Sequence, residues 1–107
     1  MIVVRIIMNV LPEKQKELTQ TLLSLVEPPG KERGYLRYDI FCDIKDKNVF
    51  NLISEWENRP RLDLHMMSDN FGILLGTKSL LSDPIKIQIH TISGTEGKEA
   101  VNTVRRK

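Results

Sequence analysis

Residues 49–71 read VFNLISEWENRPRLDLHMMSDNF, and this stretch contains the clearest signals in the sequence for a strand followed by a helix. Residues 49–57 alternate between two faces, which predicts a strand with one face formed by Phe50, Leu52, Ser54 and Trp56. Asn58 then predicts a helix N-cap, and Pro60 suits the first turn of that helix. We therefore expect a strand that turns into a helix carrying His65, which would bring an imidazole beside the only tryptophan.

Another strand is predicted just before this one, over residues 35–44. The turn between the two strands is only Asp46-Lys47-Asn48, so we expect an antiparallel hairpin. Alternation in the earlier strand places four side chains on one face, namely Leu36, Tyr38, Ile40 and Cys42. We expect this face to meet the helices, and we expect Cys42 to be a buried small hydrophobe rather than a reactive thiol.

The N-terminal part of the chain predicts a strand followed by a helix. Residues 2–10 have one entirely apolar face, which is typical of a strand packed on a core and is formed by Ile2, Val4, Ile6, Met8 and Val10. Pro12 then opens a helix, since proline is tolerated in the first turn. The apolar face of that helix consists of Leu18, Leu22, Leu25 and Val26. The Pro-Pro-Gly sequence at residues 28–30 is expected to end it.

The C-terminal part repeats this alternation of element types. Ser68 restarts a helical segment that extends to about Lys78, and two glycines inside it favour a second helix that is broken or bent. Pro84 then precedes a last strand, predicted over residues 85–92 from its alternating isoleucines.

The predicted order is β-α-β-β-α-β, which is the split βαβ, ferredoxin-like plan of the α+β class. It has a four-stranded antiparallel sheet with both helices on one face. The other face would leave Val3, Ile7 and Phe41 uncovered among polar groups. Two such sheets packed face to face would bury them, so we expect a homodimer that forms a dimeric α/β barrel. Residues 1–94 are expected to form this domain, and residues 95–107 a tail that is a short helix or a mobile segment.

Composition excludes several classes of partner. The chain of 107 residues has a net charge of +2. Residues 95–107 hold four basic and two acidic residues, so residues 1–94 balance at 12 of each, and we expect no nucleic-acid partner. No apolar run approaches the ~20 residues that a membrane span needs, and a single cysteine allows no intrachain disulfide. We expect a cytoplasmic protein without a membrane partner.

The side chain that could carry chemistry is His65. Helical spacing puts Asp69 four residues further on, where its carboxylate could hold one ring nitrogen. A partly buried histidine that hydrogen-bonds a backbone carbonyl also explains His65, and ordinary core packing also explains Trp56 and Phe71. No second histidine lies at ligand spacing from His65 or His90, so we expect no metal site.

Residues 1–92 resemble the antibiotic biosynthesis monooxygenase (ABM) domain family, small dimeric ferredoxin-like proteins that include quinol monooxygenases. The matching pieces are Gly34-Tyr35-Leu36-Arg37-Tyr38, Trp56-Glu57-Asn58, and the helical series Leu62, His65, Ser68 and Phe71. The chain departs from the family at Ser54, where many members carry a glutamate two residues before the tryptophan. Glu55 does not replace it, because it points to the opposite sheet face.

The resemblance implies a cofactor-independent monooxygenase that acts with O2 on a small phenolic or quinol-type aromatic substrate. In such a reaction a base deprotonates the phenol, and the electron-rich anion then reduces O2 without flavin or metal. The implied catalytic base is His65. The implied substrate-binding residues are Trp56, Tyr38, Phe71 and Ser68, with Tyr38 donating a hydrogen bond to the anion.

Two other functions are compatible with the same scaffold, because fold does not determine function. One is an isomerase or other proton-transfer enzyme acting on a small carbonyl metabolite, in which His65 would matter but O2 would not. The other is a non-catalytic ligand-binding dimer, in which replacing His65 would change only binding or stability.

Overall fold

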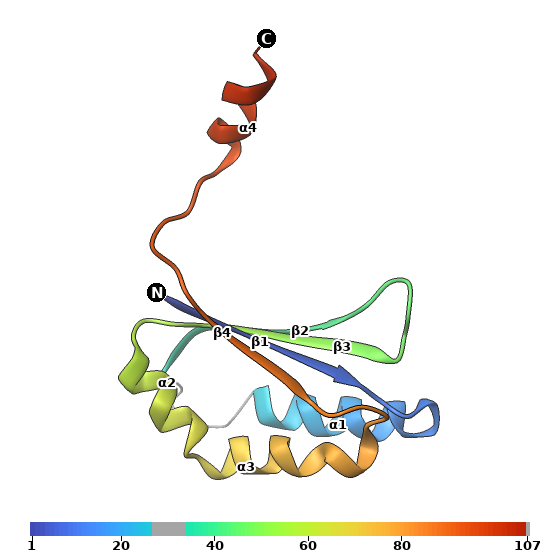
Figure 1. Cartoon of the computed structure of the whole chain (residues 1–107). Helices are drawn as coiled ribbons and strands as arrows, with labels where there is room; N and C mark the ends of the chain where they lie inside the picture. The colour runs from blue at the N-terminus through green and yellow to red at the C-terminus, as the bar shows by residue number, and fades with distance from the viewer. Residues whose placement is uncertain (27–33, 107) are drawn as a thin grey trace.

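A four-stranded antiparallel sheet with helices on one face forms the body of the protein (Figure 1). The computed structural model describes residues 1–26 and 34–106. The strands are β1 (Ile2–Asn9), β2 (Tyr35–Cys42), β3 (Val49–Trp56) and β4 (Lys86–Thr91). Their order across the sheet is β2-β3-β1-β4, which confirms the predicted ferredoxin-like α+β plan.

The helices follow the predicted order with small shifts at their ends. They are η1 (Pro12–Lys14), α1 (Gln15–Val26), α2 (Arg59–Met66), α3 (Asp69–Gly76), η2 (Thr77–Leu80) and α4 (Lys98–Arg105). Pro12 opens a 3-10 turn, and the α-helix begins at Gln15. The predicted break in the second helix is confirmed at Ser68, which is the N-cap of α3. The helix stop predicted at residues 28–30 lies outside the described residues.

The core lies between the sheet and the helices. Alternate residues of β1 are buried, namely Ile2, Val4, Ile6 and Met8, as the strand pattern predicts. Leu18 and Leu22 of α1 pack against them and are also buried. Each buried aliphatic side chain of this size contributes roughly 1.5–3 kcal/mol to folding, so this layer holds α1 on the sheet.

Strand β2 departs from the predicted alternation at its first residues. The pairing register with β3 shifts between Tyr35 and Arg37, so Tyr35 lies opposite Trp56 and Leu36 is 59% exposed. The prediction that Leu36 meets the helices is therefore wrong, because a bulge moves the side chains before it to the other face. Gly34 precedes the bulge with φ +74, a conformation that favours glycine.

Cys42 also differs from the prediction, because it is exposed. It lies at the end of β2, which is an edge strand of the sheet. Its thiol contacts the carbonyl oxygen of Lys47 at 3.5 Å, within the turn of the hairpin. Alternation shows which face a residue occupies, whereas its burial also depends on how far the helices extend over that strand.

The other face of the sheet carries a mixture of apolar and polar side chains. Val3 and Ile7 are only partly buried there, and Phe41 is 47% exposed. Between them the Nε atom of Arg5 donates a hydrogen bond to Oδ1 of Asn51 at 3.0 Å. We call this surface the open face, because α1, α2 and α3 lie on the opposite side of the sheet (Figure 1).

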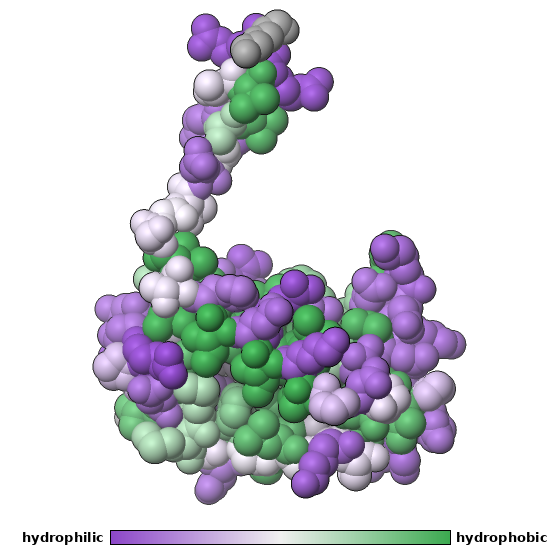
Figure 2. Space-filling model, in the orientation of Figure 1, coloured by the Kyte–Doolittle hydropathy of each residue, from purple (hydrophilic) through white to green (hydrophobic). Residues whose placement is uncertain are grey.

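After β4 the chain leaves the body, and α4 stands apart from it (Figure 1). The radius of gyration is 16.1 Å, whereas a compact chain of this length would have about 13 Å. Figure 2 shows apolar side chains of α4 on the surface of this arm. Among residues 1–26 and 34–106, no helix combines the length and the apolar character that a membrane crossing requires.

Candidate functional site

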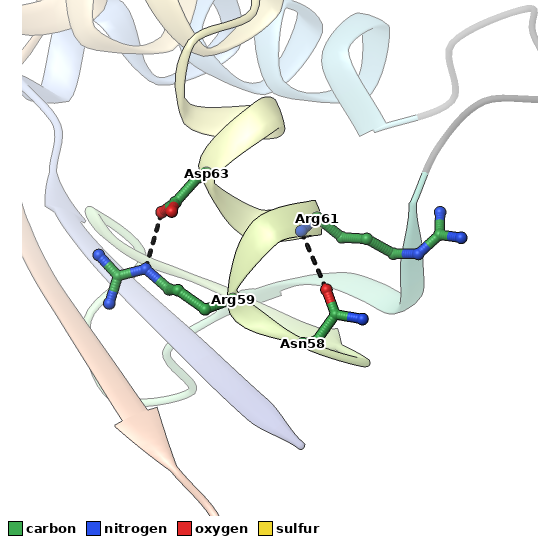
Figure 3. A network of polar contacts seen from close by, with 4 residues as sticks. All are labelled: Asn58, Arg59, Arg61 and Asp63. Atoms are coloured by element: carbon green, nitrogen blue, oxygen red, sulfur yellow. Dashed lines mark hydrogen bonds and ion pairs between the residues drawn. The ribbon is translucent and has the colours of Figure 1, made fainter.

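The helix that carries His65 begins at a well-formed cap. Oδ1 of Asn58 accepts a hydrogen bond from the backbone N–H of Arg61 at 3.1 Å, as predicted (Figure 3). One turn along, Nε of Arg59 donates to Oδ1 of Asp63 at 2.7 Å. That ion pair is exposed and contributes only a few tenths of a kcal/mol, so the cap is the stronger determinant of where α2 starts. His65 then lies in the last turn, above the end of β3.

The imidazole of His65 is surrounded by aromatic rings from three other elements. Its ring centroid lies 4.7 Å from that of Trp56, with the two planes tilted by 33°. Phe71 of α3 and Tyr38 of β2 approach it edge to face, at 5.4 Å and 6.1 Å. The structure thus brings together four of the five predicted site residues as ring neighbours.

Tyr35 is a member of this cluster that the sequence reasoning missed. Its ring meets Tyr38 at 5.5 Å and Trp56 at 5.9 Å, edge to face in both cases. The register shift in β2 turns it toward the helices. Gly34 was the available signal in the sequence, because a glycine beside a strand often marks a bulge.

Trp56 lies behind His65 with no exposed surface of its own. Its side chain is 0% exposed, and its Nε1 donates a hydrogen bond to Oγ of Ser54 at 2.9 Å. Ser54 is buried as well, so it occupies the inner position where the family resemblance leads one to expect a glutamate. Glu55 lies on the open face, opposite Val3 and Arg37. The site therefore has no carboxylate from β3.

Ser68 connects the two helices at the site. Its hydroxyl donates to the backbone carbonyl oxygen of His65 at 2.6 Å and accepts from the backbone N–H of Phe71 at 3.2 Å. These two bonds close the corner between α2 and α3. They set the relative positions of the His65 and Phe71 rings, which start three residues on either side of Ser68.

Burial favours the neutral form of both polar groups of the site. It lowers the pKa of His65 below its ordinary value of 6.5 and, with a smaller contribution from Tyr35, raises the pKa of Tyr38 to about 12. His65 therefore presents an unprotonated nitrogen, and Tyr38 a hydroxyl proton. The pair combines a proton acceptor with a hydrogen-bond donor in largely apolar surroundings.

These polar atoms have no protein partner within the described part of the chain. No hydrogen bond joins the His65 ring to Asp69, so the predicted carboxylate support for the imidazole is absent among the described residues. Among the described residues, no side-chain nitrogen or oxygen that is fully buried lacks a hydrogen-bond partner. The ring nitrogens of His65 and the hydroxyl of Tyr38 have no such partner there, so these atoms are accessible to solvent. Within residues 1–26 and 34–106, no three His, Cys, Asp or Glu side chains could jointly hold a metal ion.

Comparison with known proteins gives the family of the chain. The model of the family described as antibiotic biosynthesis monooxygenase (ABM) matches residues 1–72. The chain is 31% identical over 88 residues to "Putative monooxygenase YcnE" of Bacillus subtilis (strain 168), which covers 81% of this chain and 93% of that protein.

Two solved structures share the fold at similar identity. One is a crystal structure of an antibiotic biosynthesis monooxygenase, with 26% identity, a TM-score of 0.79, and coverage of 88% of this chain and 100% of that one. The other is a conserved protein from Methanosarcina mazei Go1, with 29% identity, a TM-score of 0.76, and coverage of 83% and 89%. The chain belongs to the antibiotic biosynthesis monooxygenase family.

Proposed function

We propose that the protein is a cofactor-independent monooxygenase that oxidises a small phenolic or quinol-type aromatic substrate with O2. The observation that carries the proposal is the pairing of the neutral His65 imidazole with the neutral Tyr38 hydroxyl inside an aromatic cluster. Membership of the family supports monooxygenase chemistry in general. The substrate class rests on the chemistry that these two groups can perform.

The first step is removal of the phenol proton. An unprotonated nitrogen of His65 accepts it, and the Tyr38 hydroxyl donates a hydrogen bond to the phenolate oxygen that forms. A neutral base suits this role, since a protonated imidazole could not accept the proton. The pKa of about 12 keeps Tyr38 a donor over the whole physiological range.

The second step is oxidation of the anion by O2, with all electrons supplied by the substrate. For a hydroquinone, one oxygen atom enters the ring, the other leaves as water, and the product is a hydroxyquinone. Four hydrogens of the substrate remain on the product and two leave in the water, so no external reductant is needed. The protein contributes orientation, a base and a site with little water.

The remaining site residues act by holding the imidazole. Trp56 is fully buried and tilted against His65, so we assign it and Phe71 the role of fixing the ring rather than direct stacking on substrate. The Ser68 hydroxyl is engaged at the corner between α2 and α3, so we assign it to the same positioning role.

We also propose that two copies pack through their open faces as a homodimer, which completes the dimeric α/β barrel. Val3, Ile7 and Phe41 on that face are partly or largely exposed in the single chain. Sheet-to-sheet packing would remove them from water. Sedimentation should therefore give about twice the chain mass of 12.4 kDa, and a monomer at micromolar concentration would contradict this part of the proposal.

Oxygen uptake by metal-free protein with a panel of hydroquinones and polyphenols tests the function. We expect uptake above the autoxidation rate and a loss of at least ~10²-fold in His65→Ala, the usual contribution of a general base. His90→Ala is the matched control, because His90 is exposed on β4 and faces away from the helices. Equal uptake by wild type and His65→Ala would refute His65 as the base.

The alternative function, proton transfer on a small carbonyl compound, uses the same pair of residues. Removing O2 distinguishes it from the monooxygenase. Under anaerobic conditions an isomerase would still exchange an acidic C–H proton of a small carbonyl compound with solvent, and would depend on His65. A monooxygenase would give no product without O2. Anaerobic turnover would therefore move the assignment to proton transfer.

A further inference from the structure

Arg61 lies at the edge of the aromatic cluster, one helical turn before His65. The two residues are four positions apart on α2, so they share one face of the helix, with about 5–6 Å between their Cβ atoms. The Cα–Cβ bonds of a helix tilt toward its N-terminus, so the side chain of His65 leans toward the turn that carries Arg61. A positively charged residue is therefore the neighbour of the proposed base along α2.

A second contact ties Arg61 to the start of β2. A Cβ at Gly34 would lie 4.0 Å from Cβ of Arg61 and 3.6 Å from a ring carbon of Trp56. Gly34 directly precedes Tyr35, whose ring meets the rings of Trp56 and Tyr38. The side chain of Arg61 thus begins beside the corner at which β2 enters the aromatic cluster.

The guanidinium of Arg61 differs from that of Arg59 in having no described counter-ion. Nε of Arg59 bonds Oδ1 of Asp63, whereas no carboxylate in the described part of the chain lies within ion-pair distance of Arg61. Figure 3 shows the two arginine side chains leaving α2 in opposite directions, with that of Arg61 extended toward the start of β2. Arg61 is exposed, so its guanidinium can rotate to meet a ligand beside His65.

The polar groups that surround His65 in the cluster carry no charge that would oppose an anion. Tyr38 presents a neutral hydroxyl, because burial raises its pKa to about 12. Ser54 occupies the inner position of β3, and Glu55 lies on the open face, so this strand sends no carboxylate into the site. One cation beside neutral polar and aromatic groups favours an aromatic ligand that carries a negative charge.

A carboxylate is the anion that fits this arrangement best. The planar guanidinium of arginine binds a carboxylate through two parallel hydrogen bonds, which fix the orientation of the bound group as well as its position. A phenol carboxylate carries its hydroxyl and its acid group at separate positions of one ring. The two residues that would bind these groups are one helical turn apart, about 5.4 Å along the axis.

We propose that Arg61 determines the specificity of the site, and that the substrate is a phenol or hydroquinone with a carboxylate on its ring. The guanidinium binds the carboxylate and thereby holds the phenolic hydroxyl at His65 and Tyr38. The inference rests on the proposed function and names the substrate class for the same site. Arg61 binds the substrate but accepts no proton and transfers no electron.

Two substrates that differ in charge test this selection. Gentisate is a hydroquinone carboxylate, and gentisamide has the same ring with a neutral group of similar size. We expect kcat/KM for oxygen uptake to be at least about tenfold higher for gentisate in the wild-type protein. In Arg61→Gln the two values should become equal, with that for gentisamide unchanged. Arg61→Lys should restore part of the preference, since it restores the charge without the planar fork.

Arg59→Gln is the matched control, because Arg59 lies on the same helix but is held by Asp63 and points the other way. This variant should keep the full preference for gentisate. Circular dichroism should show that both variants fold as the wild type does, since both arginines are exposed. A preference for gentisate that persists in Arg61→Gln, or that is lost equally in Arg59→Gln, would overturn the proposal.

Binding without turnover separates this inference from the proposed function. Calorimetry under argon compares para-hydroxybenzoate with para-hydroxybenzamide, and the acid should bind at least about tenfold more tightly to the wild type but not to Arg61→Gln. Equal binding of acid and amide, or no binding of either, would overturn the role of Arg61. Tight binding of the acid that depends on Arg61, without oxygen uptake from any substrate, would refute the monooxygenase alone. Uptake that depends on His65 but is equal for gentisate and gentisamide would refute the role of Arg61 alone.

Discussion

The two faces of the sheet differ in what covers them, although both are built from the same strands. On the helix side, Trp56 is fully buried against the ring of His65. On the open face, its neighbour Glu55 is only partly buried and lies among polar groups. Successive residues of one strand thus face different surroundings: the helix side holds the aromatic site, and the open face is the surface for which we propose a second chain.

Removal of Trp56 should have the largest effect of any single change in this comparison. Trp56→Ala deletes a fully buried side chain and leaves a cavity beneath His65, so we expect a loss of about 3–5 kcal/mol in the free energy of unfolding. Denaturant unfolding followed by circular dichroism measures it. Glu55→Ala, one residue away on the open face, should change stability by no more than about 0.5 kcal/mol. Comparable losses in the two variants would break the distinction between the faces.

Removal of the Tyr38 hydroxyl should have the next largest effect, and it should lower the reaction rate rather than the stability. Tyr38→Phe keeps the ring that meets His65 but removes the donor to the phenolate, so kcat should fall about 10²-fold. Steady-state oxygen uptake measures it. Asp39→Asn, on the next residue and the other face, should leave kcat unchanged. An unchanged kcat in Tyr38→Phe would mean that the hydroxyl does not contact the reacting oxygen.

Much of this asymmetry could be predicted from the alternation of residues. The strand over residues 49–57, the cap at Asn58 and the restart at Ser68 follow from local patterns, because caps and alternation act over a few residues. The approach of His65 to Trp56 follows from the same three features. These are the parts of the site in which neighbours in sequence are also neighbours in space.

The parts that could not be predicted depend on register and on extent. A shift of one residue in β2 moves Tyr35 to the helix side and Leu36 into solvent, since each slip exchanges the faces. Exposure of Cys42 depends on its place at the end of an edge strand. Similarly, the alternation places Ser54 and Trp56 on one face but does not predict the hydrogen bond between them, because that bond depends on the rotamers of both side chains.

That indole bond should have a moderate effect when it is removed. Ser54→Ala leaves the buried Nε1–H of Trp56 without its acceptor, which should cost about 1–3 kcal/mol of unfolding free energy. Ser24→Ala, which removes an exposed hydroxyl from α1, is the control and should be close to neutral. If Ser54→Ala matched the control, the indole would not need this acceptor, and the serine would have no positioning role.

The smallest expected effect is the dependence of stability on the protonation of His65. Burial lowers the pKa of His65 in the folded state below 6.5, so the unfolded chain binds its proton more readily. Stability should therefore be complete above pH 6.5 and should decline as the pH falls from 6.5 through the lowered pKa. Urea unfolding from about pH 8 to about pH 5.5 measures this slope, above the range in which carboxylates titrate.

His65→Gln should flatten that slope, whereas His90→Gln should preserve it, because His90 lies on the other face of the sheet and outside the aromatic cluster around His65. The direction of the shift in the His65 pKa matters for function as well as for folding. Protonation of folded His65 also removes the base, so oxygen uptake should fall at the lower end of this range, as the pH passes through the lowered pKa of the folded protein. If His65→Gln kept the full slope, the imidazole would not be the group that senses pH, and its surroundings would have to be less apolar than the ring contacts with Trp56 and Phe71 indicate.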